Sequence, residues 1–510
     1  MAIQPEDRVT MSLSPVNEKL PHDNDDDEVT RMGYAAEIPR KFNLLSLFAI
    51  GYEICLSPIA LVVGMGVSLG SGGQTTLIWG QLIMYFMVLC VSISLAELAS
   101  AYPNAGGQYY WAAMLAPKSV RRGISFVVGY LGWASAVFSC ASTLTAIAEM
   151  AVAMYQLRNP DVVAHPWTIF VTYQAFNMVM FIFNCWERIV TKSSRLWLAV
   201  TILSPIVIFI TLLARADTKQ SAEFVFTGFT NLSGWNDGIA FLTGLLGVNW
   251  AFSGIDAVTH MAEEIPDPRR NVPRALIATI IVGAVLAWPT AIVFMYVVPD
   301  IKSVISTDTG LPSLAIFLSV FQGETAGPVA LQTLLLLGSL GAVFAIQTWQ
   351  ARLAWAIARD GGFPFAKYIK AIAPIPYEVP LWAHLWSSLF VALLGCLYLG
   401  SSIAFNSLVG GAILMQYVSY SIPVVLLLLR GRSNIPRGPF WLGKWGLFCN
   451  IITLLWTAFA LVFYSFPPYY PTTLTTMNYI SVVVVGFALV CSVYYLFFGR
   501  RTFTGPPNVE

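Results

Sequence analysis

Long apolar segments alternate with short polar loops from about residue 43 to about residue 498. A helix that crosses a bilayer needs about 20 predominantly apolar residues, and twelve segments meet this requirement. The strands of a transmembrane barrel would instead alternate apolar and polar positions over about ten residues. The pattern therefore predicts an all-α polytopic membrane protein. Its expected spans lie at roughly 43–69, 75–98, 123–155, 166–184, 195–215, 237–261, 275–298, 327–358, 380–400, 404–429, 446–466 and 477–498.

Two of these segments, 123–155 and 327–358, are longer than the bilayer is thick. Neither contains a polar break at which the chain could turn back. We therefore expect each to form one tilted or extended helix rather than two spans.

Composition supports a membrane protein and argues against several other classes. Hydrophobic residues make up 57% of the chain and charged residues only 11%, whereas about a quarter of the residues in soluble domains are charged. The net charge of +1 and the scattered basic residues argue against a nucleic-acid partner. The seven cysteines show neither CxxC nor Cys/His metal spacing. We therefore expect no disulfide framework, no bound metal and no cofactor.

The distribution of basic residues predicts the orientation of the spans. Lys and Arg concentrate in the loops after spans two, four, six, eight and ten and in the C-terminal tail, whereas the opposite loops hold few. Basic loops face the cytoplasm, so both termini are expected there, with the first span as an uncleaved insertion signal. The sequon at Asn231 then falls in an external loop, where N-glycosylation is expected to be possible. The expected location is the plasma membrane, with an internal membrane as the alternative.

The two ends of the chain are polar. Residues 1–42 lack apolar periodicity and contain the acidic run Asp23–Glu28, which predicts a disordered cytoplasmic tail. Such a tail either has no dedicated partner or serves regulated turnover. Residues 499–510 are expected to form a second cytoplasmic tail.

The most specific motif is SLAELASAYPNAGGQYYW at residues 94–111. Glu97 stands at the end of the second span, Pro103 prevents the helix from continuing, and Gly106 and Gly107 permit a turn that a side chain would obstruct. The order E-x-x-S-x-x-P-x-x-G-G-x-Y resembles the signature of the amino acid/polyamine/organocation transporter superfamily. The motif is expected to form a cytoplasmic hinge rather than a substrate contact.

Two further stretches extend the resemblance over most of the chain. Residues 247–275 (GVNWAFSGIDAVTHMAEEIPDPRRNVPRA) are similar to the sixth helix of that superfamily. Residues 352–364 (RLAWAIARDGGFP) resemble a stretch of its fungal amino acid/choline transporters. The resemblance implies the leucine-transporter-type fold. Spans one to five (43–215) and six to ten (237–429) would then be inverted repeats, and the last two spans (446–498) would be peripheral.

Transporters of this kind interrupt their first and sixth spans inside the bilayer. An interrupted helix leaves N–H and C=O groups unpaired, which is tolerable only where they line a cavity, and there they can bind a charged solute. Phe252, Ser253 and Gly254 offer such a break in span six, and residues 51–58 offer one in span one. Two alternatives are a break at Gly64-Met65-Gly66 and glycines that only allow close helix packing. The expected substrate-binding residues are Gly51, Tyr52, Glu53, Trp250, Phe252, Ser253, Gly254 and Asp256.

Acidic residues within apolar segments are the main candidates for substrate recognition, because a carboxylate in hydrocarbon is costly. Glu53, with Tyr52, Trp133, Trp250 and Phe252 as aromatic walls, would favour a cationic amine through charge attraction and cation–π contact. Three alternatives remain: Glu53 is protonated, serves proton coupling, or lies on another face of its helix.

A second set of residues is expected to serve coupling or gating. Glu149 has no motif around it, which favours a role as a partner within the helix bundle. His260, Glu263 and Glu264 lie at the inner end of span six and form either a cytoplasmic gate of salt bridges or a proton relay. Proton coupling is expected because buried acids can titrate. The complete set is Glu97, Glu149, His260, Glu263 and Glu264.

The resemblance implies a permease that imports an amino acid or a related amine such as GABA or choline by proton symport with alternating access. The alternative is a transporter-like nutrient sensor with little or no net transport. The sequence contains no GxxxxGK[ST] loop and no recognisable nucleophile–base pair. Neither an ATP-driven pump nor an enzyme is therefore expected.

Overall fold

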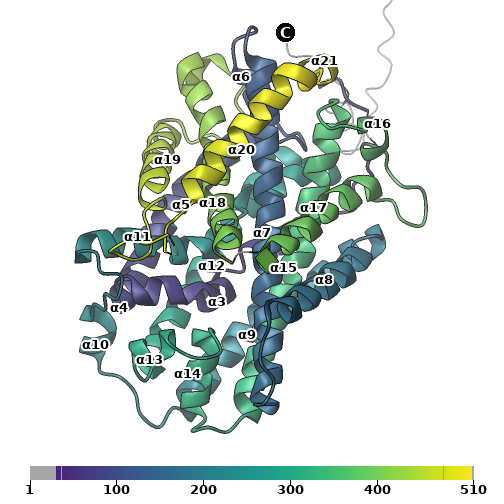
Figure 1. Cartoon of the computed structure of the whole chain (residues 1–510). Coiled ribbons are helices and arrows are strands. Elements are labelled where there is room, and N and C mark those ends of the chain that lie inside the picture. The colour runs from purple at the N-terminus through teal and green to yellow at the C-terminus, as the bar shows by residue number, and fades with distance from the viewer. Residues whose placement is uncertain (1–29, 31, 36, 401, 475, 508–510) are drawn as a thin grey trace, which may run out of the picture.

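The computed structural model describes residues 30, 32–35, 37–400, 402–474 and 476–507. Within this part of the chain it is a helical bundle with twelve segments long and apolar enough to cross a membrane (Figure 1). The predicted fold class and number of spans are confirmed.

The spans follow one another as in the expected order, and several consist of two or three helical pieces. They are α2–α3 (Leu44–Cys55, Ser57–Gly70), α4–η1–α5 (Gly73–Thr75, Thr76–Gly80, Gln81–Ala101), α7 (Arg121–Arg158), α8 (Pro166–Phe183), α9 (Glu187–Arg215), α11–η2–η3 (Asp237–Asn249, Trp250–Phe252, Ile255–Glu264), α12 (Pro268–Val297), α15 (Ala326–Arg359), α17 (Leu381–Gly400), α18 (Ser402–Arg430), α19 (Lys444–Phe463) and α20–η5–α21 (Ile480–Tyr494, Tyr495–Gly499, Arg500–Thr502). The short connecting helices are α6 (Gln108–Leu115), α10 (Ala222–Thr227), α13 (Ile301–Ile305), α14 (Pro312–Val320), α16 (Ala366–Ile369) and η4 (Arg432–Asn434).

Helices α7 and α15 form the central pair of the bundle. Each is a single helix, of 38 and 34 residues, so the expectation of one long helix in each segment is confirmed. At 1.5 Å per residue, α7 extends about 57 Å, well beyond a hydrocarbon core of about 30 Å. The two helices pack against each other, and α18 packs on α7.

The first span is broken at Leu56, between α2 and α3. Pro58 cannot continue α2, because it lacks an N–H and its ring clashes with the carbonyl four residues earlier, but it fits the first turn of α3. Leu56 itself takes a left-handed conformation with φ 46°, which costs a non-glycine residue about 1–3 kcal/mol. The alternative site is excluded as a break, because Gly64 and Gly66 lie within the continuous helix α3.

The sixth span is broken at Ser253 and Gly254, as the small residues there predict. Ser253 has an extended ψ of 143° and Gly254 a left-handed φ of 75°. The span then resumes as a 3-10 helix of ten residues, although such helices rarely exceed four residues and often mark a hinge. The conformation of this segment is therefore set by its packing rather than by local preference.

The two ends of the bundle differ. Helices α6, α16 and α21 gather at the end that carries the C-terminus, and α10, α13 and α14 at the opposite end (Figure 1). We call these the inner and outer ends. The predicted disordered tail falls largely on residues 1–29, 31 and 36, outside the described residues. The described residues at the end of this predicted tail pack on the bundle, where Tyr34, Ile38 and Phe42 are buried.

Two spans begin earlier than the apolar pattern predicts. Helix α9 starts at Glu187 instead of 195, and α12 starts at Pro268 instead of 275. The added turns contain charged and polar residues, which a hydropathy rule leaves out. Glu187 is buried because Arg352 pairs with it, and this pairing makes a charged helix start compatible with the bundle.

We expect Gly254→Ala to destabilise the protein. A Cβ at this position would lie 2.5 Å from Ile54 Cγ2, in a backbone conformation that side chains rarely adopt. The variant should show a lower apparent melting temperature and less monodisperse protein in detergent size-exclusion chromatography. Gly486→Ala is the matched control, because that glycine lies in α20 and an added Cβ meets nothing within 4 Å. Equal behaviour of the two variants would contradict the expectation.

Candidate functional site

A small cavity lies between the two interrupted spans. This inner chamber has a volume of about 30 Å³, room for about one water molecule. Apolar side chains of α2, α3 and α15 form most of its wall, including Ile54 and Leu56 beside the first break. The side chains that bring polar atoms to its wall are Ser139, Thr143, Trp250, Ser253 and Ser339.

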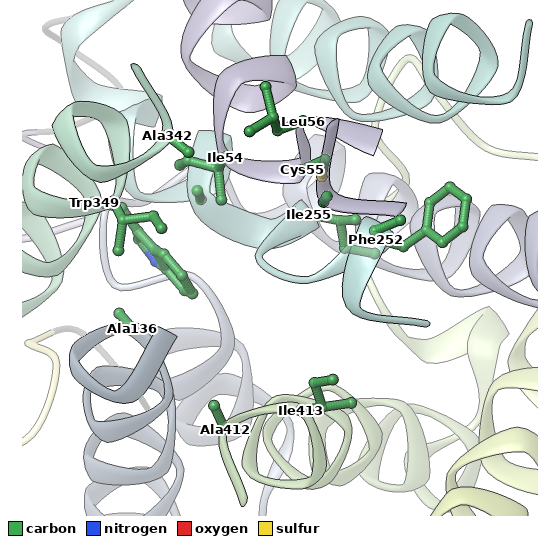
Figure 2. Packing of buried hydrophobic residues seen from close by; sticks show 14 of the residues in the cluster. Ile54, Cys55, Leu56, Ala136, Phe252, Ile255, Ala342, Trp349, Ala412 and Ile413 are labelled. Carbon is green, nitrogen blue, oxygen red and sulfur yellow. The ribbon is translucent and has the colours of Figure 1, made fainter. Parts of the chain in front are cut away.

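The breaks in spans one and six touch each other. The thiol of Cys55 donates a hydrogen bond of 3.5 Å to the carbonyl oxygen of Ser253. Gly254 lies so close to Ile54 that a Cβ would overlap it. Figure 2 shows Ile54, Cys55 and Leu56 beside Phe252 and Ile255, with Trp349 and Ala342 of α15 and Ile413 of α18 nearby. The two interruptions therefore form one structural unit.

Gln416 of α18 satisfies the polar groups that the break in span six exposes. Its Oε1 accepts a hydrogen bond from the Gly254 N–H at 3.0 Å. Its Nε2 donates to the hydroxyls of Ser253 at 2.9 Å and Ser139 at 3.3 Å. A buried N–H without a partner would cost about 1–3 kcal/mol. The Gln416 amide thus links the break in span six to α18, on which it lies, and to Ser139 of α7.

A much larger cavity lies on the outer side of the chamber. This outer vestibule has a volume of about 680 Å³ and is lined by α3, α7, α11 and the loops at the outer end. Val63 and Trp250 line both cavities. The ring of Trp250 lies on Gly64, where a Cβ would come within 3.2 Å of Trp250 Cε3. The side chains of Val63 and Trp250 therefore stand between the chamber and the vestibule.

The structure places only part of the predicted binding set at the chamber. Trp250 and Ser253 line it, and Gly254 adjoins it through Ile54. Phe252 packs edge-on against Tyr85 instead.

Gly51 and Tyr52 face other helices. Gly51 adjoins Val258 of η3 and Thr279 of α12, and Tyr52 belongs to a small cluster with Leu198 of α9. Trp133, expected as a cage wall, donates a hydrogen bond to Ser387 of α17 at 2.9 Å. The proposed aromatic cage is therefore not assembled around the chamber.

Glu53 is fully buried on α2. Neither of its carboxylate oxygens has a hydrogen-bond partner among the described residues, and it is not part of the chamber wall. An ionised carboxylate without a partner is strongly disfavoured in such surroundings. Glu53 therefore requires either a proton or a partner that this conformation does not supply.

Asp256 is held by several polar groups rather than facing the chamber. Gln108 Nε2 donates to its Oδ2 at 2.9 Å, the Tyr420 hydroxyl donates to its Oδ1, and His260 Nε2 lies 3.3 Å from Oδ2. His260 Nδ1 lies 2.8 Å from the carbonyl oxygen of Ala105. These contacts connect the sixth span to the segment around Gly106 and Gly107.

An ionic cluster closes the inner end, and we call Tyr34, Tyr109, Glu263, Arg359 and Asp360 the inner cluster. Arg359 pairs with Glu263 at 2.8 Å and stacks on the ring of Tyr34 at 3.7 Å. The hydroxyls of Tyr34 and Tyr109 donate to Asp360 at 3.0 and 3.1 Å. Burial raises the pKa of the Asp360 carboxyl from 3.8 to about 6, although Arg359 and the two hydroxyls act in the opposite direction.

A second ionic group lies beside the inner cluster. Arg352 is buried within α15 and pairs with Glu187 at 2.9 Å and with Glu264 at 3.0 Å. Removing one partner of such a buried pair costs roughly 3–5 kcal/mol. Glu263 and Glu264 are thus both held in ion pairs, and a role of either residue in a gate or a proton relay stays a prediction.

Glu97 and Glu149 lie apart from each other and from the inner chamber. Glu97 is buried and pairs with Arg432 at 2.8 Å, which ties the end of α5 to the loop before α19. Glu149 lines the outer vestibule and accepts a 3.3 Å hydrogen bond from Tyr398. Neither lies at the chamber.

The sequon at Asn231 is part of a folded turn. Its side-chain amide donates to the carbonyl oxygen of Trp235 at 2.7 Å and to Asp237 at 3.0 Å. Ser233 is buried and donates to Asn231 Oδ1 at 2.7 Å. N-glycosylation at this position stays a prediction, and these contacts do not favour it once the protein has folded.

Sequence reasoning missed several residues of the site. Ser139, Thr143 and Ser339 lie in long apolar helices, where serine and threonine are common and no local pattern distinguishes them. Gln416 offered a weak signal, since a glutamine in a span requires a polar partner. Among the described residues, no group of three or more His, Cys, Asp or Glu side chains is arranged to hold a metal ion.

Comparisons with known proteins agree with this architecture. The profile of the amino acid permease family matches residues 42–488. A choline transporter of Saccharomyces cerevisiae is 40% identical over 466 residues, which cover 91% of this chain and 82% of the relative. A swainsonine transporter of Arthroderma benhamiae is 40% identical over 459 residues, covering 90% and 91%. A GABA-specific permease of Saccharomyces cerevisiae is 30% identical over 495 residues, covering 95% and 86%.

The family profile covers all three stretches on which the resemblance was based, at residues 94–111, 247–275 and 352–364. The resemblance is thus confirmed over most of the chain. The protein is an integral membrane transporter, and the chain belongs to the amino acid permease family of the amino acid/polyamine/organocation superfamily.

Proposed function

We propose that the protein moves a small amine or amino acid across its membrane by proton symport with alternating access. One observation carries the proposal: two interrupted spans meet at a chamber that lies between an open vestibule and a closed inner end. Helix ends at such a break can bind a charged solute. The proposal includes two inverted repeats, residues 43–215 and 237–429, each beginning with an interrupted span.

The conformation fits an outward-open or occluded stage of such a cycle. The outer vestibule reaches Trp250, whereas the inner cluster and the pairs of Arg352 join the inner ends of spans six and eight. Release of a substrate to the inner side requires these contacts to separate. Closure of this kind, by movement of one set of helices against another, is a common switching mechanism.

The substrate class follows from the chamber and from the named relatives. Choline and GABA both have a nitrogen that is positively charged at neutral pH, and swainsonine is an amine. An indole from Trp250 and hydroxyls from Ser139, Thr143 and Ser253 suit a small organic cation or zwitterion. The chamber of about 30 Å³ must widen to hold one, which fits a site that forms fully only when substrate binds.

Glu53 is our candidate for the proton-coupling residue. It is buried on the half-helix just before the first break and lacks a hydrogen-bond partner. A proton would neutralise it in the present conformation, and a change in its surroundings would release that proton. Among the predicted acids, Glu53 is the one whose carboxylate has no hydrogen-bond or ion-pair partner in the described part of the chain, so its ionised form is the least stabilised.

We further infer that the protein resides in the plasma membrane with both termini in the cytoplasm. The concentration of Lys and Arg in the loops of the inner end supports this orientation. The inner cluster would then face the cytoplasm, and the vestibule would face the outside.

A nutrient sensor is the second candidate, and one observation favours it. Both ends of the described chain contact Asp360. The Tyr34 hydroxyl donates a hydrogen bond to the Asp360 carboxylate, and the Thr504 backbone N–H donates one to the Asp360 carbonyl oxygen at 3.0 Å. A change at the inner end would therefore reach both tails. Signalling without net uptake would support this candidate over a transporter.

Uptake of labelled choline, GABA and a panel of amino acids tests the proposal. The assay uses transport-deficient cells that express the protein, with and without a protonophore. We expect accumulation of at least one amine and its loss when the protonophore collapses the gradient. Expression at the cell surface without accumulation of any compound would reject the transport function.

Glu53→Gln should uncouple transport from protons. The amide keeps the size of the side chain and removes no hydrogen bond, so the protein should fold normally. Uptake should lose most of its stimulation by an acidic exterior, about tenfold or more, for cationic and neutral substrates alike. Tyr52→Phe, the buried neighbour, is the control and should keep the stimulation. A loss confined to cationic substrates would instead indicate direct contact between Glu53 and substrate.

Asp360→Asn should remove a pH dependence of stability. The folded protein holds the Asp360 proton more tightly than the unfolded chain does, because burial raises its pKa to about 6. The free energy of unfolding should therefore fall by roughly 2 kcal/mol as the pH rises from about 4 to about 7. Apparent melting temperatures between pH 4 and pH 7 measure this slope. The exposed Asp161→Asn variant should keep the wild-type slope, and the same slope in Asp360→Asn would refute the assignment.

A further inference from the structure

The outer vestibule is far larger than a passage to the chamber requires. Its volume of about 680 Å³ lies within the range of cavities that bind small molecules. Tyr469 and Met477 in its lining are 48% and 43% exposed, so the cavity opens at the surface of the molecule. It can therefore hold a solute on the outer side of Trp250 and Val63.

Glu149 is the only charged side chain among the described residues that line this cavity. It follows Ser142 and Thr145 along one face of α7, at the three- and four-residue spacing that places side chains on the same side of a helix. The Tyr398 hydroxyl donates to its Oε1 at 3.3 Å and orients the carboxylate. No lysine, arginine or histidine of the described lining opposes its charge.

The vestibule also has aromatic walls. Trp250 forms part of its floor, and Phe463, Phe466 and Tyr469 lie toward the mouth. Low-dielectric walls around one negative charge focus its field and concentrate cations. Aromatic faces add attraction for ammonium groups.

Glu149 is too far from the chamber to serve the substrate there. Thr143, the residue of the chamber wall nearest to Glu149 on α7, lies six residues before it, which corresponds to about 9 Å along the helix. A solute beside Glu149 is therefore bound at a different place.

We propose that the outer vestibule is a second binding site for a small organic cation, with Glu149 as its counter-charge. The identity of that cation rests on the proposed function, as an amine that approaches the chamber from outside. The carboxylate captures the cation, and Trp250 and Val63 separate it from the chamber. Neutral molecules of the same shape gain nothing from Glu149.

Equilibrium binding to the purified full chain in lipid nanodiscs tests this site. The probes are choline and its uncharged carbon analogue 3,3-dimethylbutan-1-ol, at low and at physiological ionic strength. Glu149→Gln should weaken choline binding about tenfold at low salt and leave the neutral analogue unchanged. The salt dependence of choline binding should also disappear.

Glu324→Gln is the matched control. Glu324 lies in an exposed loop at the outer end, pairs with Arg215 on the surface and does not line the cavity. It should behave as the wild type does. Choline binding that is absent, or that is equal in Glu149→Gln and Glu324→Gln, would overturn the proposal.

The uptake assay separates this result from the proposed function. Glu149-dependent binding without uptake would keep the outer site and reject the transporter. Uptake with no effect of Glu149→Gln on choline binding would keep the transporter and reject the outer site.

Discussion

Backbone polar groups cannot stay unpaired in hydrocarbon, and the rest of this structure depends on that constraint. Two spans are nevertheless interrupted, at Leu56 and at Ser253-Gly254. The breaks are tolerated because they lie inside the bundle, touch each other and receive a side-chain partner from Gln416. The polar groups they bring together, in a protein otherwise built from apolar helices, are the basis of the proposed solute site.

The overall architecture was predictable from the sequence because apolar length and helix-breaking residues are local signals. Twelve runs of apolar residues gave twelve spans. Ser253 and Gly254 mark the break in span six through their own backbone chemistry, whereas the sequence left the break in span one open between residues 51–58 and Gly64-Met65-Gly66. The starts of α9 and α12 were placed too late, because their charged first turns are buried by partners such as Arg352 that lie far away in sequence.

The site was predictable only in part, because its geometry depends on which faces of distant helices converge. Trp250 and Ser253 lie at the chamber as expected. Asp256 was expected to bind substrate, but Gln108 and Tyr420, from other elements, hold its carboxylate. Glu149 stands in an apolar helix without a motif, and only the fold shows that its carboxylate lies in an open cavity.

The two barriers along the pathway differ in kind. On the outer side the side chains of Trp250 and Val63 separate the chamber from the vestibule. Rotation of one side chain takes picoseconds to nanoseconds where it is unhindered, whereas helix movements that break several ion pairs take microseconds to milliseconds. In the proposed cycle, a solute would return to the outside by movement of side chains, whereas its release to the inside requires separation of the ion pairs of Arg352 and Arg359. Separation of these buried ion pairs would then be the slower step and would set the turnover.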